Sequence, residues 1–211
     1  MNLLLAFAVL MSGETQVPDG TLLFLERGNL VVELWTGKDI THVGMIFREG
    51  GEPWLYEAVP GKVRRIRLDA YYREISEYNR GRRDPARVWL CQPSKSYSPQ
   101  ACTDMRSFLQ SQIDRRYSIK NYVKGRNGDG IHCAELTAET LNQSGRFQFS
   151  NSFAISPGEL AESIRPHYEG AIGVQLAPPL ERSWCERSTD WWLGFVHWCG
   201  WSCNEALSFC R

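Results

Sequence analysis

Short apolar runs separated by turn residues fill the first half of the chain, a pattern typical of an antiparallel meander. Pro18, Asp19 and Gly20 form a turn signal ahead of the first run. Gly50 and Gly51 separate the second run from the third and predict a hairpin. We therefore predict strands at 21–27, 41–47, 53–59 and 63–68.

The second half alternates helical and strand-like patterns. Apolar residues recur at helical spacing, with Ser98-Pro99 as one helix start and Gly145 as one helix end. Residues 116–131 are expected to form a glycine-rich approach to the helix that follows. We predict helices at 28–37, within 69–85, and at 98–113, 132–143 and 155–164, with further strands at 87–93 and 171–177.

This order of elements predicts an α+β fold in which a central antiparallel sheet packs against the helix that begins near Cys133. At 211 residues, the chain is long enough to bury the core of one ordinary domain. We place that domain at 18–177, after a leader at 1–17 and before an appendage at 178–211.

The leader and the appendage differ in composition from the domain. Residues 3–11 form an apolar core of the length of a secretory signal, although no Lys or Arg precedes it and no clean cleavage site follows. We predict export to the periplasm or outside the cell; the alternative is a buried first element of a cytoplasmic protein. The appendage contains five of the eight Trp and four of the seven Cys, and its run from Trp191 to Trp201 is too short to cross a bilayer.

Seven cysteines suit an oxidising compartment, and the odd number leaves one thiol unpaired. Six are expected to form disulfides, Cys91 with Cys102 and four in the tail, so that Cys133 is the free thiol. The tail has two alternatives, a metal site that includes His197 and an interfacial contact of its Trp residues with a membrane. The tail cysteines are Cys185, Cys199, Cys203 and Cys210.

Charge excludes one class of partner. The chain has 24 Lys and Arg against 24 Asp and Glu, so no net field favours a nucleic acid. The basic run of Arg64, Arg65 and Arg67 is interleaved with apolar residues, and we interpret it as the solvated face of a strand edge.

Three residues fit the chemistry of a thiol hydrolase, which needs a thiolate, a base and a group that orients the base. Cys133 stands at a predicted helix start, where free N–H groups favour a thiolate and can hold an oxyanion. His42 lies in one predicted strand and Glu57 in the next, where a buried carboxylate is reasonable beside an imidazole. Taken alone, a Cys near a helix start is more often a small core residue than a nucleophile, and His42 alone would be interpreted as a half-buried structural histidine.

The motifs around these residues resemble a known family. Thr36-Gly37, His42-Val43-Gly44, Tyr56-Glu57-Ala58, and Cys133 with Glu135-Leu136 are similar to the pattern of the YiiX/YebB-like family, a circularly permuted branch of the NlpC and papain-like cysteine hydrolases. The resemblance spans roughly residues 18–165 and implies a permuted papain-like fold with Cys133 as nucleophile, His42 as base and Glu57 as third member.

The resemblance also implies a substrate class and shows where this chain departs. It implies cleavage of an amide or ester bond in a peptide-like, cell-wall or lipid-linked substrate, without metal or cofactor. Ala134 replaces a common Ser, and His132 replaces an aromatic residue; we expect adjacent helical positions to point His132 away from the thiol. Tyr117 is the candidate substrate-binding residue, although Ser118 replaces the usual Asp.

Two other functions remain open on the same residues. An acyltransferase of the lecithin:retinol type would use the same triad but pass the acyl group to an alcohol or amine. A non-catalytic binding domain would keep the fold and carry an unreactive Cys133. If the protein is a hydrolase or an acyltransferase, we expect Cys133 to face an open cleft.

Overall fold

The computed structural model describes residues 17–28, 37–125 and 128–179, together with residues 188, 192 and 196. Six strands and five α-helices lie in these ranges, with two short 3-10 turns at Ser152–Ala154 and Arg165–His167. The strands are β1 (Thr21–Glu26), β2 (Ile40–Glu49), β3 (Glu52–Val59), β4 (Lys62–Arg67), β5 (Arg87–Cys91) and β6 (Ile172–Val174). The helices are α2 (Leu68–Tyr78), α3 (Pro99–Gln112), α4 (Lys120–Lys124), α5 (Cys133–Gln143) and α6 (Pro157–Ile164).

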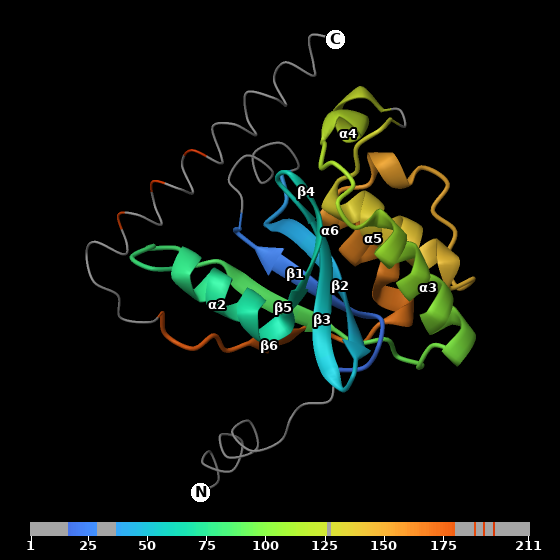
Figure 1. Cartoon of the computed structure of the whole chain (residues 1–211), viewed down its shortest axis with the longest axis horizontal. Coiled ribbons are helices and arrows are strands. Elements are labelled where there is room, and N and C mark those ends of the chain that lie inside the picture. The colour runs from blue at the N-terminus through green and yellow to red at the C-terminus, as the bar shows by residue number, and fades with distance from the viewer. Residues whose placement is uncertain are drawn as a thin grey trace, which may run out of the picture.

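All six strands form one antiparallel sheet in the order β4-β3-β2-β1-β5-β6. Helix α2 covers one face, and α3, α5 and α6 lie on the other (Figure 1). The predicted mixed α+β architecture with a central antiparallel sheet is therefore confirmed.

Alternation along the strands supplies each face with its own core. Val43 and Met45 pack with the helices α3, α5 and α6, whereas Ile46 and Leu55 pack with α2. This division follows the predicted pleat of β2, and it places His42, Gly44 and Ile46 on the face that α2 covers.

Tight hairpins fix the register of β2, β3 and β4. Gly50 and Gly51 both have positive φ, at 60° and 88°, as the predicted two-residue hairpin turn requires. Another two-residue connection joins β3 to β4, where Val59 pairs with Lys62. Counting back from that turn brings residue 57 opposite residue 64.

Helix caps explain where the predicted helices begin. The Ser98 side chain accepts a hydrogen bond from Ala101 N, and Pro99 occupies the first turn of α3. Ser156 and Glu159 form a capping box at the start of α6. Helix α5 ends as predicted, before Gly145 with a φ of 68°.

Some expectations differ from the structure. The predicted glycine-rich approach contains a one-turn helix, α4, that ends at Gly125 in a left-handed conformation. The final strand covers only Ile172–Val174. The helix expected at 28–37, the leader and most of the tail lie outside the described residues.

The expected disulfide between Cys91 and Cys102 is wrong. Both are free thiols that pack at the margin of the core, Cys91 at the end of β5 and Cys102 in α3, as small apolar side chains do. The tail cysteines lie outside the described residues.

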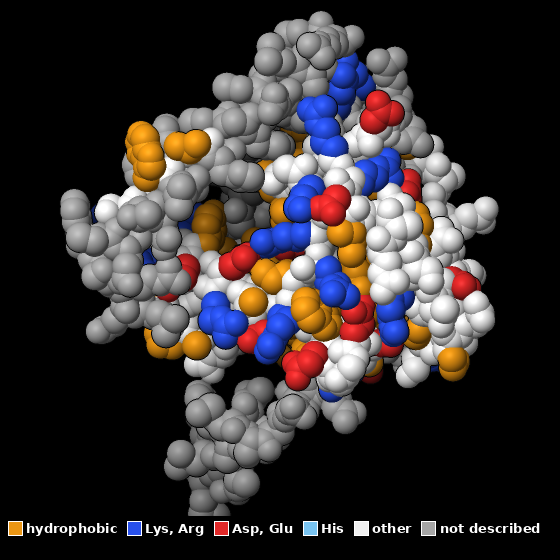
Figure 2. Space-filling model, viewed as in Figure 1, with side chains coloured by type: hydrophobic (Ala, Val, Ile, Leu, Met, Phe, Trp, Pro, Cys, Tyr) orange, Lys and Arg blue, Asp and Glu red, His pale blue; other side chains and the backbone are white. Residues whose placement is uncertain are grey.

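Surface charges of both signs intermingle on the face shown in Figure 2, as expected from the balanced composition. Of the helices that the structure describes, none combines the length and apolarity needed to cross a membrane.

Candidate active site

His42 and Glu57 meet on the α2 face of the sheet. Met45 of β2 lies opposite Tyr56 of β3, so Gly44 lies opposite Glu57 and His42 is its diagonal neighbour. A Cβ atom at position 44 would lie 2.7 Å from the Leu55 side chain and 3.3 Å from the Cβ of Glu57. Glycine at this position therefore leaves the space that the Glu57 side chain occupies.

The His42 Nε2 atom lies 2.6 Å from Glu57 Oε2, and Glu57 is 1% exposed. Burial disfavours the charged His42 ring, but the Cys133 thiol and the Glu57 carboxylate outweigh burial and raise the pKa of His42 above its usual range. Burial likewise opposes ionisation of Glu57, but His42 and the Arg64 guanidinium outweigh it and lower the pKa of Glu57. The pair therefore favours an imidazolium held by a carboxylate.

Cys133 is the first residue of α5, and its thiol lies within electrostatic reach of the imidazoles of His132 and His42. With Nε2 of His42 facing Glu57, Nδ1 is the ring atom left for the thiol. Burial raises the pKa of the thiol, but the contacts with His132 and His42 outweigh burial and lower the pKa of Cys133. The thiol is thus favoured as a thiolate.

The expectation of a thiol open to a cleft is wrong. Cys133 is 5% exposed and belongs to the core cluster beneath α3, α5 and α6. The His42 side chain is 16% exposed, so among the three residues it is the most accessible to solvent.

A capping box shapes the start of α5. The backbone N–H of Glu135 donates to His132 Nδ1, and the backbone N–H of His132 donates to the Glu135 carboxylate, each at 3.4 Å. The capping box does not use the N–H groups of Cys133 and Ala134. These two N–H groups lie beside the thiol and are suited to hold an oxyanion.

His132 lies closer to the thiol than the sequence predicted. It is the N-cap residue, with extended backbone at φ −107° and ψ 171°, so helical spacing does not apply to it. Its Nε2 atom lies 3.0 Å from the Phe153 carbonyl, and the Tyr122 ring packs edge-on against the imidazole. The pattern His-x-x-Glu at 132–135 matches the spacing of a capping box. This pattern could have identified His132 as the N-cap residue from the sequence.

Arg64 is the functional candidate that sequence reasoning missed. Its Nε and Nη2 atoms lie 2.8 and 2.7 Å from Glu57 Oε1, and its other contacts reach Glu74 of α2. Arg64 is therefore part of the site, not merely a solvated strand edge. The signal was the β3–β4 hairpin, which fixes position 64 opposite position 57.

Tyr117, the expected substrate-binding residue, lies in the core. It is 7% exposed, its backbone N–H donates to Gly61 O, and it forms an isolated bridge with Ile131. The ring belongs to the core cluster that includes Cys133, so packing is the role its contacts support.

His42 and Glu57 are thus paired, and the Cys133 thiol lies within electrostatic reach of His42. Such an arrangement can ionise a thiol, shuttle a proton and fix the base. Within residues 17–28, 37–125 and 128–179, no three His, Cys, Asp or Glu side chains are grouped to hold a metal ion.

Comparison with known proteins supports the fold. No protein-family model matches the sequence, and no curated protein matches it. Among solved structures, the fold is similar to the crystal structure of the metalloprotein YiiX, DUF1105, from Escherichia coli O157:H7, with a TM-score of 0.55 and 14% sequence identity. The alignment covers 78% of this chain and 99% of that chain, so the two share an α+β fold.

Proposed function

We propose that this protein is a cysteine hydrolase on a permuted papain-like, NlpC-type fold, which cleaves an amide or ester bond through an acyl-cysteine intermediate. The observation that carries the proposal is the pair of His42 and Glu57, 2.6 Å apart, together with the position of Cys133 at the start of α5 within electrostatic reach of His42. The resemblance of the sequence motifs and the likeness to YiiX support the same fold.

In the first step, the Cys133 thiolate attacks the substrate carbonyl and forms a C–S bond. The carbonyl oxygen becomes an oxyanion, which the N–H groups at the start of α5 stabilise. The His42 imidazolium then gives its proton to the leaving amine or alcohol, the C–N or C–O bond breaks, and the acyl group stays on sulfur.

In the second step, water releases the acyl group. Neutral His42 takes a proton from the attacking water, the C–S bond breaks, and the carboxylic acid leaves as the thiolate and imidazolium are restored. Glu57 keeps the imidazole oriented and stabilises its charge throughout. No redox partner or metal takes part in either step.

The substrate class follows from the motif resemblance, which favours peptide-like, cell-wall or lipid-linked molecules. We propose export of the protein, and contact of its Trp-rich tail with a membrane surface, on the basis of the sequence alone. Mass mapping without reductant, on protein taken from its native compartment, tests export: oxidised tail cysteines support it, and four freely alkylating tail thiols contradict it.

The proposal is tested by trapping the acyl intermediate. The protein is quenched in acid after brief exposure to activated esters and amides of peptide-like and fatty acyl groups, and its peptides are mapped. We expect the mass of the acyl group on Cys133 and none on Cys91 or Cys102, whose pKa values burial raises. An added alcohol or amine that captures the acyl group faster than water would identify an acyltransferase instead.

A further inference from the structure

Arg64 stands between the candidate site and the outer helix. It belongs to β4, directly opposite Glu57 in the register of the β3–β4 hairpin. Its guanidinium contacts Glu57 on one side, and on the other it pairs with Glu74 through Nη1 at 3.2 Å and Nη2 at 2.6 Å. One cation therefore joins two carboxylates, one buried in the site and one on α2.

The planar guanidinium suits this arrangement. Nε and Nη2 both reach Glu57 Oε1, while Nη1 and Nη2 reach the two oxygens of Glu74. A lysine supplies the same charge from a single point, without a rigid fork of donors. The geometry of the bridge thus depends on arginine and not on positive charge alone.

Little water reaches Glu57, so the positive charge of Arg64 strongly affects the ionisation of this carboxylate. Glu57 is 1% exposed, and Tyr71 of α2, 2% exposed, lies within electrostatic range of Glu57 and Arg64. The Tyr71 hydroxyl has no hydrogen-bond partner within the described part of the chain, as expected where little water enters. In such a setting, a buried carboxylate stays ionised only when cations and donors hold it.

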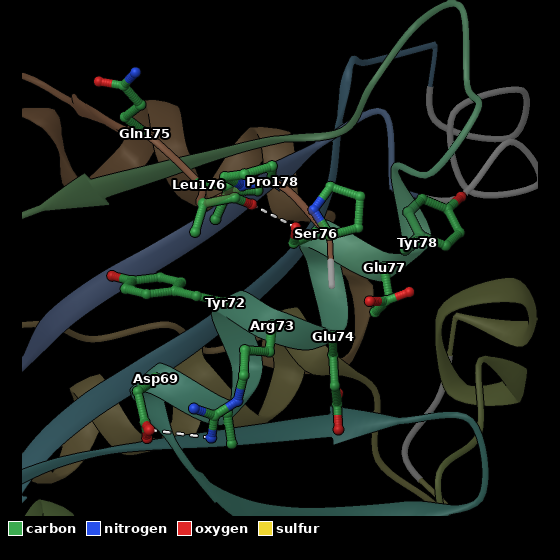
Figure 3. A pocket seen from close by; sticks show the side chains of 13 residues that line it. Asp69, Tyr72, Arg73, Glu74, Ser76, Glu77, Tyr78, Gln175, Leu176 and Pro178 are labelled. Carbon is green, nitrogen blue, oxygen red and sulfur yellow. Dashed lines mark hydrogen bonds and ion pairs between the residues drawn. The ribbon is translucent and has the colours of Figure 1, made fainter. Parts of the chain in front are cut away.

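Glu74 also belongs to a groove on the outer side of α2. The outward-facing residues of α2 between Asp69 and Tyr78 line this groove together with the segment 175–179, and Glu74 extends from the helix toward the neighbouring strands (Figure 3). Of the lining residues, Glu74 is the one that pairs with Arg64. It is partly exposed, at 47%, whereas the Arg64 side chain is 30% exposed.

We propose that Arg64 is a positioning residue of the active site, which keeps the Glu57 carboxylate ionised and directed at His42, and that Glu74 holds Arg64 in place from α2. The inference rests on the proposed function, because it assigns a role within the same thiol site. Arg64 touches neither sulfur nor imidazole in this role; it acts through Glu57.

The readout is the alkylation of Cys133 by iodoacetamide as a function of pH, followed by peptide mass mapping. This rate follows the fraction of thiolate and requires no substrate. The charged and titratable groups around the thiol are His42 on β2, Glu57 on β3, Arg64 on β4, Tyr71 and Glu74 on α2, and His132 and Glu135 at the start of α5.

Arg64→Gln removes the cation, so Glu57 gains a proton more readily or turns away, and the His42 imidazolium loses its anionic neighbour. The thiolate then forms at higher pH, and we expect the midpoint of alkylation to rise in the same direction as in Glu57→Gln. Arg64→Lys should give a smaller rise and Glu74→Gln the smallest. In Arg64→Gln combined with Glu57→Gln, the rise should not exceed that of Glu57→Gln alone, because Arg64 acts through Glu57.

Arg67→Gln is the matched control, because Arg67 is also a β4 arginine, is 52% exposed, and pairs with Glu52 and Asp69 at the surface. Its alkylation profile should match that of the unchanged protein. The positioning role is overturned if Arg64→Gln leaves the midpoint unchanged or lowers it while Glu57→Gln raises it. If Arg64→Gln does not fold, unchanged midpoints in both Arg64→Lys and Glu74→Gln overturn it instead.

Failure of the proposed function gives a different result. In that case, His42→Gln and Glu57→Gln also leave the midpoint where it is, because the thiol was not activated by this chain of residues. Circular dichroism of every variant, measured in the same buffers, confirms that each midpoint refers to folded protein.

Discussion

Two histidines act electrostatically on the Cys133 thiol, and their hydrogen-bond partners differ. His42 comes from a strand, and its second ring nitrogen faces the ionised Glu57 carboxylate. His132 is the N-cap of α5: its Nδ1 accepts from the N–H of Glu135, and its Nε2 lies 3.0 Å from the carbonyl of Phe153 and 3.7 Å from the Glu135 carboxylate. The same side chain is thus arranged to carry charge at one position and to fix a helix at the other.

The difference follows from what each partner tolerates. A carboxylate becomes a stronger partner when His42 gains a proton, whereas protonation of His132 Nδ1 would break the hydrogen bond from Glu135 N. Burial lowers the pKa of His132, but the thiol and the Phe153 carbonyl outweigh burial and raise it. The hydrogen bond that Nδ1 accepts from the Glu135 N–H opposes this rise, because it is lost when Nδ1 gains a proton.

The largest effect is expected from the residues that perform the chemistry. Cys133→Ala should abolish turnover, and His42→Ala should reduce it about 100- to 10,000-fold, the range that proton transfer by a positioned base contributes. Initial rates on a substrate found by acyl trapping measure both. His132→Asn is the matched comparison: asparagine also caps helices well, so this variant should keep most of its activity.

The comparison of the two histidines would fail if His132→Asn lost as much activity as His42→Ala. The assignment of different roles to the two histidines would also be contradicted if His42→Ala retained near-native turnover. In either case, the partners of a ring would not determine its role.

Glu57→Gln should cost less than loss of the base. The thiolate is already favoured by the helix N-terminus, so a cysteine enzyme depends less on its third residue than a serine enzyme does. We expect a loss of about 10- to 100-fold in kcat, well below the roughly 10,000-fold that a serine triad loses with its Asp. An unchanged rate in this variant would return Glu57 to a structural role.

The pH dependence of turnover should fall off on both sides of neutrality. Activity rises with pH as Cys133 loses its proton, at a pH below the ordinary thiol pKa of about 8.5 because its pKa is lowered. Activity falls again at alkaline pH as His42, whose pKa is raised, loses the proton that the leaving group needs. A profile of kcat/KM that rises only above the ordinary thiol pKa would contradict this assignment.

The smallest expected effect concerns stability at the cap. His132→Ala removes an N-cap acceptor and should lower the free energy of unfolding by about 1 kcal/mol, with additional loss from its contact with Tyr122. His132→Asn should recover the part due to capping. Urea denaturation of the two variants measures the difference, and equal stabilities would show that the cap contributes nothing.

Much of this site could be predicted from the sequence, because the periodicity of apolar residues indicates which strand or helix holds each residue. The strand pattern of 41–47 and the amphipathic helix after His132 placed His42 and Cys133 in the correct elements. The position of Glu57 in the next strand could be predicted for the same reason. Each of these predictions needs only local sequence and the period of a strand or helix.

The remainder depends on register and burial, which local patterns do not specify. The role of Arg64 requires the pairing of β3 with β4, and the contact of His132 requires the extended backbone of an N-cap. The burial of Cys133 and Tyr117 depends on how α5 and the segment before it pack on the sheet. The free thiols of Cys91 and Cys102 likewise depend on packing and not on the count of cysteines.

The most direct test of the account compares the three described free thiols in one unchanged protein. Residues Cys91, Cys102 and Cys133 are alkylated together at pH 6 to 7, well below the ordinary thiol pKa of about 8.5, and each modified peptide is quantified with time. We expect Cys133 to react first although it is the most buried, because His42 and its partners hold it as a thiolate. Faster alkylation of Cys91 or Cys102 under these conditions, in folded protein, would contradict the central claim that Cys133 is an activated nucleophile.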